Sequence, residues 1–181
     1  MKNTTFRVAP AQSRIEWLGK KVTGTHDGTI QLKSGELILS SDGKLVGGRI
    51  VVDTTSIKVL DIGDAVTNAQ MTGHLASDDF FSSDKFPEAT LDIVSVDGNH
   101  VSANLSIKGI THRISFEVLL NSSDSIVIAS TRLLIDRTKY EMKFRSGNFF
   151  QNLGDTLIYN DFELHVSLTA KSVTKTEAVL S

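Results

Sequence analysis

The residues best suited to chemistry in this chain gather in one stretch, "HLASDDFFSSDKFP", at positions 74–87. His74 and Asp78 lie four residues apart, so on a helix both side chains would share one face and could reach the same metal ion. Such a pair supplies only two of the four ligands that zinc usually takes. We therefore expect no metal site; His74 should hydrogen-bond a neighbouring group, and Asp78 or Asp79 should end the helix.

General acid and base catalysis by the adjacent pair Asp78 and Asp79 is a second interpretation. Neighbouring residues on a helix point about 100° apart, whereas catalytic carboxylate pairs converge across a cleft. The two serines that follow, Ser82 and Ser83, stand beside charged residues, which is typical of an exposed loop. No catalytic residue is predicted in this stretch.

Composition excludes several further classes of function. The 181 residues contain no cysteine, which rules out thiolate metal sites and cysteine nucleophiles. The formal net charge of -2 gives no electrostatic sign of a nucleic-acid partner. The chain also lacks a glycine-rich phosphate loop and the HExxH, GxSxG and CxxC motifs. We therefore expect no cofactor, no metal and no nucleic acid.

The distribution of apolar residues along the chain indicates where in the cell the protein is expected. No run of about eighteen apolar residues occurs, so no membrane span is predicted. The opening "MKNTTFRVAP" lacks the apolar core of a signal peptide. We expect a soluble cytoplasmic protein, or a periplasmic one if an export signal has been removed from the chain.

Most of the chain alternates between apolar and polar residues with a period of two, as strands with one buried face do. Turn sequences such as "SDGK" and "DGNH" separate these segments. Gly109 falls where a hairpin turn between two of them would need it. About eight strands at this spacing indicate an antiparallel sandwich or an up-and-down barrel. The strands are expected within residues 13–19, 28–40, 47–53, 89–96, 101–109, 112–120, 128–136 and 160–171.

One region breaks this period. The spacing of Met71 and Leu75 predicts a short helix between residues 67 and 79. Phe80, Phe81 and Phe86 follow it directly, and each ring can bury on the order of 150 to 250 Å². These rings either plug one end of the sheet or line a site for an apolar ligand.

The inward-facing positions bear on whether the interior is filled or hollow. Bulky residues such as Trp17 and Phe162 occur together with small ones such as Gly48, Ala103 and Ala129. Small inward residues leave space, and a barrel of about eight strands can hold one small ligand, so a cavity is favoured. The predicted cavity lining is Trp17, Ile30, Ile50, Leu75, Phe80, Phe81, Phe86, Ile93, Leu105, Phe116, Leu133, Phe162 and Leu164.

Five motifs, in order along the chain, resemble those of the YceI-like family: "VAPAQSRIEW", "VVDTTSIKV", "HLASDDFFSSDKFPEATL", "ANLSIKGITHRISFEV" and "LLIDRTKY". The third motif is the most specific, because it joins a His-Leu pair, an Asp-Asp-Phe-Phe run and a Lys-Phe-Pro ending. The resemblance runs from about residue 6 to 170. It implies a single domain over residues 1–181, with a tail at 172–181, that folds as an antiparallel eight-stranded lipocalin-like barrel with one short helix.

The resemblance also implies a bacterial, non-enzymatic protein whose apolar interior holds a polyisoprenoid or related lipid. The chain departs from the family pattern at three places. Ala9 stands where the opening motif has Asp, Met71 and Thr72 replace a common Arg-Asp pair, and Glu141 replaces a common Gly. Polar contacts to a ligand's head group near the barrel mouth are therefore expected to differ from those of relatives.

Three hypotheses of function follow. The leading one is binding of a long-chain apolar ligand (a polyisoprenoid, an isoprenoid quinone or a fatty-acid-like lipid) inside the barrel, for storage, transport or stress protection. The second is an enzyme that acts on a small apolar substrate through His74 or Asp79 at the cavity mouth. The third is a structural barrel with a filled core and a protein partner. A homodimer stays open under all three.

Overall fold

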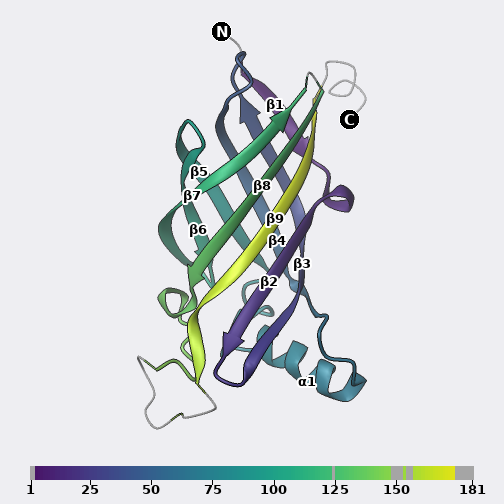
Figure 1. Ribbon diagram of the computed structural model, residues 1–181, viewed down its shortest axis with the longest axis vertical. Helices are drawn as coiled ribbons and strands as arrows, with labels where there is room; N and C mark the ends of the chain where they lie inside the picture. The colour runs from purple at the N-terminus through teal and green to yellow at the C-terminus, as the bar shows by residue number, and fades with distance from the viewer. Residues whose placement is uncertain (1–2, 124, 148–152, 154–156, 174–181) are drawn as a thin grey trace.

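The computed structural model describes residues 3–123, 125–147, 153 and 157–173. Its strands form one antiparallel sheet that closes on itself into a barrel (Figure 1). The order around the ring is β3-β2-β9-β8-β7-β6-β5-β4, and β4 returns to pair with β3. The strand bounds are β1 Thr4–Val8, β2 Arg14–Lys21, β3 Gly24–Leu39, β4 Leu45–Val59, β5 Glu88–Asp97, β6 His100–Ile107, β7 Ile110–Ser122, β8 Ile126–Asp136 and β9 Ile158–Ser172.

The first two strands act as one interrupted strand. β1 pairs with the last residues of β3 and of β9, placing Phe6 opposite both Leu37 and Ser172. β2 pairs with earlier residues of the same two neighbours. Between them lies the 3₁₀ helix η1 (Pro10–Gln12), which starts at a proline that has no N–H to donate to a neighbouring strand. Eight strands therefore surround the interior, and the predicted eight-stranded lipocalin-like barrel is confirmed.

The alternation seen in the sequence matches the two faces of the sheet. In β6 the four residues expected to face inward, Val101, Ala103, Leu105 and Ile107, are all buried. The predicted hairpin to β7 is also present. Lys108 and Gly109 at its tip both have positive φ, 55° and 73°, as a two-residue turn that matches the twist of the strands requires.

The barrel wall has one seam. β7 pairs with β8 only along Val118–Ser122. Beyond that stretch the 3₁₀ helix η2 (Arg137–Tyr140) contacts β7. His112 Nε2 lies 3.0 Å from the Lys139 carbonyl oxygen, and its ring meets Tyr140 edge-on at 5.2 Å. Tyr140 is only 1% exposed, so its ring packs into the seam.

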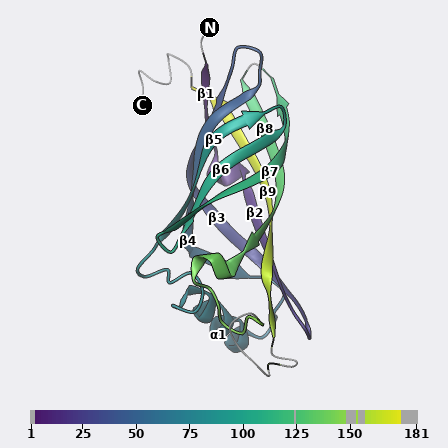
Figure 2. The ribbon, with the colours of Figure 1, turned by 90° about the vertical axis from the view of Figure 1, so that its left-hand side faces the viewer.

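The helix α1 (Ala65–Ala76) lies across the end of the barrel at which the β2–β3 hairpin turns (Figures 1 and 2). The predicted helix is confirmed, but it starts two residues before and ends three residues before the expected bounds. It starts early because the Asp64 carboxylate accepts a hydrogen bond from the Thr67 N–H at 2.9 Å. It ends early because Ser77 is extended.

Among the residues described, no helix has the length and apolar character needed to cross a bilayer. Of the predicted C-terminal tail, Ser172 instead ends β9, and residues 174–181 lie outside the described residues.

Candidate functional site

The barrel encloses a cavity of about 230 Å³. Every strand from β2 to β9 contributes inward-facing apolar residues to its wall, and α1 adds Met71 and Leu75 at one end. Such a wall offers almost no hydrogen bonds to water, so the interior suits a hydrocarbon better than solvent.

The structure places most of the predicted lining residues in this wall. Twelve of the thirteen are there: Trp17, Ile30, Ile50, Leu75, Phe80, Phe81, Ile93, Leu105, Phe116, Leu133, Phe162 and Leu164. Phe86 is the exception, because its ring packs against Gly109 at the β6–β7 turn. That these residues contact a ligand stays a prediction.

Trp17 is held in the wall by the close approach of its indole ring to the backbone of Gly28 and Lys58. Its indole N–H donates to the Lys58 carbonyl oxygen at 3.1 Å, across Gly28. A Cβ at Gly28 would lie 1.7 Å from that oxygen and 2.7 Å from the indole, so only glycine fits there. The absence of a side chain at Gly28 thus fixes the position of the largest ring in the wall.

Phe80 and Phe81 are positioned by a compact loop that follows α1. The backbone N–H groups of Ser82 and Ser83 donate to the carbonyl oxygens of Ser77 and Ala76, at 2.8 and 2.9 Å. The Ser83 hydroxyl donates to the Thr54 carbonyl oxygen on β4 at 3.0 Å. Both serines are buried, so the expectation of an exposed loop was wrong. The Ser83 hydroxyl is buried because it joins the loop to β4, and the Ser82 hydroxyl because it bonds to Asp78 within the loop.

The polar residues of the same stretch form two separate pairs. His74 Nε2 lies 2.9 Å from Asp79 Oδ2, and the His74 ring packs edge-on against Phe144 at 4.6 Å. Asp78 is separate and accepts a hydrogen bond from Ser82 Oγ at 2.6 Å. Neither His74 nor Asp79 belongs to the cavity wall. Within the described parts of the chain, no three His, Asp or Glu side chains are grouped as metal ligands.

Charged residues do enter the wall, but only at the α1 end. They come from the β2–β3 hairpin, from η2 and from the start of β9, and the sequence analysis missed them because they follow no strand alternation. Figure 2 shows η2 and α1 at the same end of the barrel. The polar residues of the wall at this end are Lys20, Lys21, His26, Arg137, Tyr159 and Asp161.

Arg137 is the most deeply buried of these side chains, at 3% exposed. Its guanidinium donates from Nε to the Tyr159 carbonyl oxygen at 3.0 Å, from Nη1 to that of Met142 at 2.5 Å and from Nη2 to that of Ile158 at 3.0 Å. Burial lowers the pKa of Arg137 to about 10, and the negative charge of Asp136 opposes this shift. The group therefore stays protonated at neutral pH.

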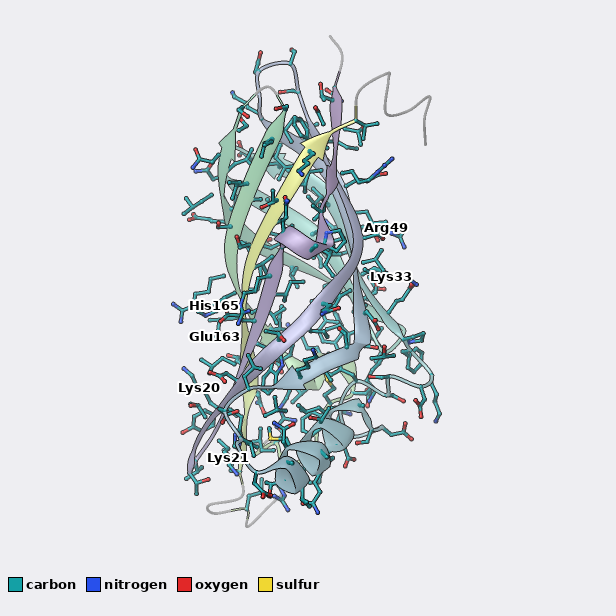
Figure 3. The ribbon with its side chains drawn as sticks, turned by 90° about the vertical axis from the view of Figure 1, so that its right-hand side faces the viewer. Lys20, Lys21, Lys33, Arg49, Glu163 and His165 are labelled. Carbon is teal, nitrogen blue, oxygen red and sulfur yellow. The ribbon has the colours of Figure 1, made fainter. Side chains whose placement is uncertain are left out.

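The outer wall carries a second charged cluster, formed by Glu163, Arg132, His165 and Lys20. Figure 3 labels Glu163, His165 and Lys20 of this cluster. Arg132 Nη2 lies 2.9 Å from both oxygens of Glu163, and His165 Nε2 lies 3.2 Å from one of them. These hydrogen bonds, from Arg132 first and His165 second, lower the pKa of Glu163 to about 2. Glu163 is 7% exposed although it faces outward, because its partners cover it.

A closed antiparallel barrel of eight strands around an apolar cavity, with one helix across its end, is a lipocalin-like fold. The chain belongs to the YceI-like domain family, whose model matches residues 6–170. This confirms the family that the sequence motifs indicated.

Two relatives come from Staphylococcus aureus. UPF0312 protein SAB2563 (strain bovine RF122 / ET3-1) is 34% identical over 87 residues, which are 42% of this chain and 49% of that protein. UPF0312 protein SA2479 (strain N315) is 43% identical over 54 residues, 30% of this chain and 32% of that protein. The chain thus spans half or less of the length of the curated relatives it matches.

Solved structures share the fold at lower identity. BcnA of Burkholderia cenocepacia is 20% identical with a TM-score of 0.66, covering 90% of this chain and 99% of its own. A polyisoprenoid binding domain from Saccharophagus degradans, implicated in plant cell wall breakdown, is 18% identical with a TM-score of 0.67, covering 93% and 99%. At these identities the likeness establishes the barrel architecture alone.

Proposed function

We propose that this protein binds one long-chain apolar ligand (a polyisoprenoid, an isoprenoid quinone or a fatty-acid-like lipid) inside the barrel, without catalysing a reaction. The observation that carries the proposal is the cavity, whose wall is apolar along nearly its whole length. The relative from Saccharophagus degradans, described as a polyisoprenoid binding domain, supports the same class of ligand. Storage, transport or protection of such a lipid under stress are the roles this binding would serve.

The affinity comes from removing the chain's apolar surface from water. Each buried methylene contributes about 0.8 kcal/mol before the entropic losses of association. Affinity is therefore expected to rise with chain length until the cavity is full and then to level off. Native mass spectrometry of the purified protein, with solvent extraction, identifies any lipid that copurifies. A protein that carries no lipid and takes up no added polyprenol, quinone or fatty acid contradicts the proposal.

A pair of neighbouring residues on β8 offers a controlled test. Ala129 belongs to the cavity wall, whereas Ile128 faces outward and is 43% exposed. Ala129→Phe should weaken binding of a fluorescent long-chain probe by about tenfold or more, since the ring takes up part of the cavity. Ile128→Phe adds a ring on the outer face of the same strand and should bind as the unaltered protein does. Circular dichroism checks that both variants are folded, and equal binding by both would argue against an interior site.

The two alternatives have less support. An enzyme that uses His74 or Asp79 requires one of these groups to reach a bound substrate, and neither is part of the cavity wall. Turnover of a small apolar substrate that His74→Ala abolishes, with binding retained, would favour that alternative. A filled structural barrel requires an interior without voids larger than a water molecule, whereas this interior holds a cavity of about 230 Å³.

A further inference from the structure

The cavity wall is chemically asymmetric along the barrel. At the β1 end, apolar residues such as Leu37, Leu45 and Leu168 form it. At the α1 end it contains four side chains that can carry positive charge, Lys20, Lys21, His26 and Arg137, against a single carboxylate. A long apolar ligand would therefore meet cationic groups at only one of its ends.

Two of these four groups already have acidic partners. Lys20 Nζ lies 3.6 Å from Glu163 on the outer wall, and His26 Nδ1 lies 2.7 Å from Asp61. Neither is available to a ligand without giving up that partner. The unpaired positive charge at this end therefore belongs to the other two groups, Arg137 and Lys21.

Arg137 has hydrogen bonds but forms no ion pair among the described residues. The three groups that accept from it are backbone carbonyl oxygens, which carry no net charge. None of the ion pairs among the described residues includes Arg137. A guanidinium has five N–H donors, and these three hydrogen bonds leave two N–H groups without an acceptor among the described residues. Buried charges in proteins are usually paired, whereas Arg137 is influenced only by the charge of its chain neighbour Asp136, with which it forms no ion pair.

Lys21 lies opposite one of the residues whose carbonyl oxygens accept from Arg137. The register of β2 and β9 places Lys21 opposite Ile158, whose carbonyl oxygen accepts from Arg137 Nη2. Figure 3 shows Lys21 near the α1 end of the barrel. Like Arg137, Lys21 takes part in no ion pair among the residues that the structure describes. The two cations thus flank one short stretch of β9 at the mouth.

We propose that the α1 end of the cavity is a subsite for an anionic head group, a phosphate or a carboxylate, which Arg137 and Lys21 hold while the apolar chain extends toward the β1 end. The inference rests on the proposed binding of a long-chain ligand and adds the class and orientation of its head. Charge-assisted hydrogen bonds to an anion are about twice as strong as those between neutral groups. The Phe80 ring, 5.9 Å from the guanidinium carbon of Arg137, shields the site on the apolar side.

The test compares ligands that share a chain and differ in the head. Geranylgeranyl phosphate is compared with geranylgeraniol, and palmitic acid with hexadecanol, by displacement of a fluorescent long-chain probe from the unaltered protein. Both anionic ligands should bind at least about tenfold more tightly than their alcohols, a difference of about 1.4 kcal/mol. If only the phosphate or only the carboxylate binds more tightly than its alcohol, the subsite is specific for that head group. If each alcohol binds as tightly as its acid, the subsite is overturned while lipid binding stands. If no ligand binds, the proposed function itself fails.

Variants assign the preference to Arg137. Arg137→Gln should reduce the preference for the anionic ligands to less than about threefold, because the part of the affinity that depends on the charge of the head group is lost. The alcohols should still bind. Lys139→Met removes an exposed cation from the same 3₁₀ helix and should keep the full preference. An unchanged preference in Arg137→Gln overturns the role of Arg137. If Arg137→Gln does not fold, the comparison of ligands in the unaltered protein still decides the proposal.

Discussion

Glu163 shows how a residue on the outer face of a strand becomes buried by its partners. Strand alternation places it outside the barrel, where Arg132, His165 and Lys20 enclose its carboxylate. Together they lower the pKa of Glu163 to about 2, below the ordinary value of 4.5. The cluster joins β2, β8 and β9 across the outer wall.

The lowered pKa of Glu163 determines how the stability of the fold changes with pH. Because the folded state binds the proton of Glu163 less tightly than the unfolded state does, the cluster stabilises the fold fully above about pH 4.5. That contribution is lost as the pH falls toward 2. Glu163→Gln should therefore lower the melting temperature at pH 7, and the difference from the unaltered protein should shrink as the pH falls from about 4.5 to 2.

Thermal melting by circular dichroism at several pH values measures this difference. Glu117→Gln, at an exposed position of β7 without a side-chain partner among the described residues, is the matched control and should leave the melting temperature nearly unchanged. A difference between Glu163→Gln and the unaltered protein that is independent of pH would contradict the assigned shift.

The sequence alone could not identify such residues. The alternation of apolar and polar residues indicates only that Glu163 and Arg137 are polar. Whether their side chains are buried depends on partners from distant segments of the chain. Glu141 is different, because the structure shows why the family commonly has glycine at this position. It ends η2 with φ of 62° and ψ of 23°, the left-handed conformation in which glycine is most easily accommodated.

At the scale of the elements, α1 stands apart because none of its residues is buried. The Asp64 cap stabilises its first turn. It is attached by the two hydrogen bonds from the Asn68 amide to the carbonyl oxygens of Val59 and Ile62, by the packing of His74 on Phe144, by the hydrogen bond from the following loop to the Ala76 carbonyl oxygen, and by the contacts of Met71 and Leu75 with the cavity. An element with no buried residue opens locally at low free energy. Movement of α1 would therefore uncover the α1 end of the cavity without disturbing the strands.

Removing the cap tests the independence of α1. Asp64→Ala should destabilise the helix by about 1 kcal/mol, because the Thr67 N–H loses its acceptor. Hydrogen exchange followed by mass spectrometry should show faster exchange in residues 64–77 and unchanged exchange in β2 and β9. Asp84→Ala, at an exposed position of the following loop, is the control. Faster exchange throughout the barrel in Asp64→Ala would mean that α1 and the sheet unfold together.

The elements differ in how far sequence could predict them. Strands with one buried face carry a period of two, so β2 to β9 were all predicted. β1 was not, because "TTFRV" is short and joins the barrel only through β3 and β9. The helix bounds were missed because they depend on a side-chain cap, and the loop serines were misjudged because β4 covers them.

At the scale of the whole molecule, the wall of the barrel has one place where neighbouring strands are only partly paired, the seam between β7 and β8. Tyr140 fills that seam from η2. Its hydroxyl is buried with no hydrogen-bond partner among the described residues, so the ring contributes packing alone. Along this seam the packing of Tyr140 and the contact of His112 with the Lys139 carbonyl oxygen stand in place of strand pairing.

Tyr140→Ala should open the seam. The loss is expected to be about 3 to 5 kcal/mol of the free energy of unfolding, as for other large buried rings. Hydrogen exchange should accelerate first in residues 110–117 and 132–136, where β7 and β8 are not paired. Tyr159→Ala, at a 48% exposed tyrosine of β9, should have a much smaller effect. Equal effects of the two substitutions on denaturant unfolding would show that the seam is not a weak line.

β1 begins and β9 ends at the end of the barrel that points away from α1 (Figure 1). Anything joined to the chain before Thr4 or after Ser172 therefore attaches at the end of the barrel opposite α1. A protein tethered there to a surface or a fusion partner would present its mouth outward. Such attachment would leave the α1 end free, so the proposed uptake of a long-chain probe could be followed on a surface without the anchor obstructing that end.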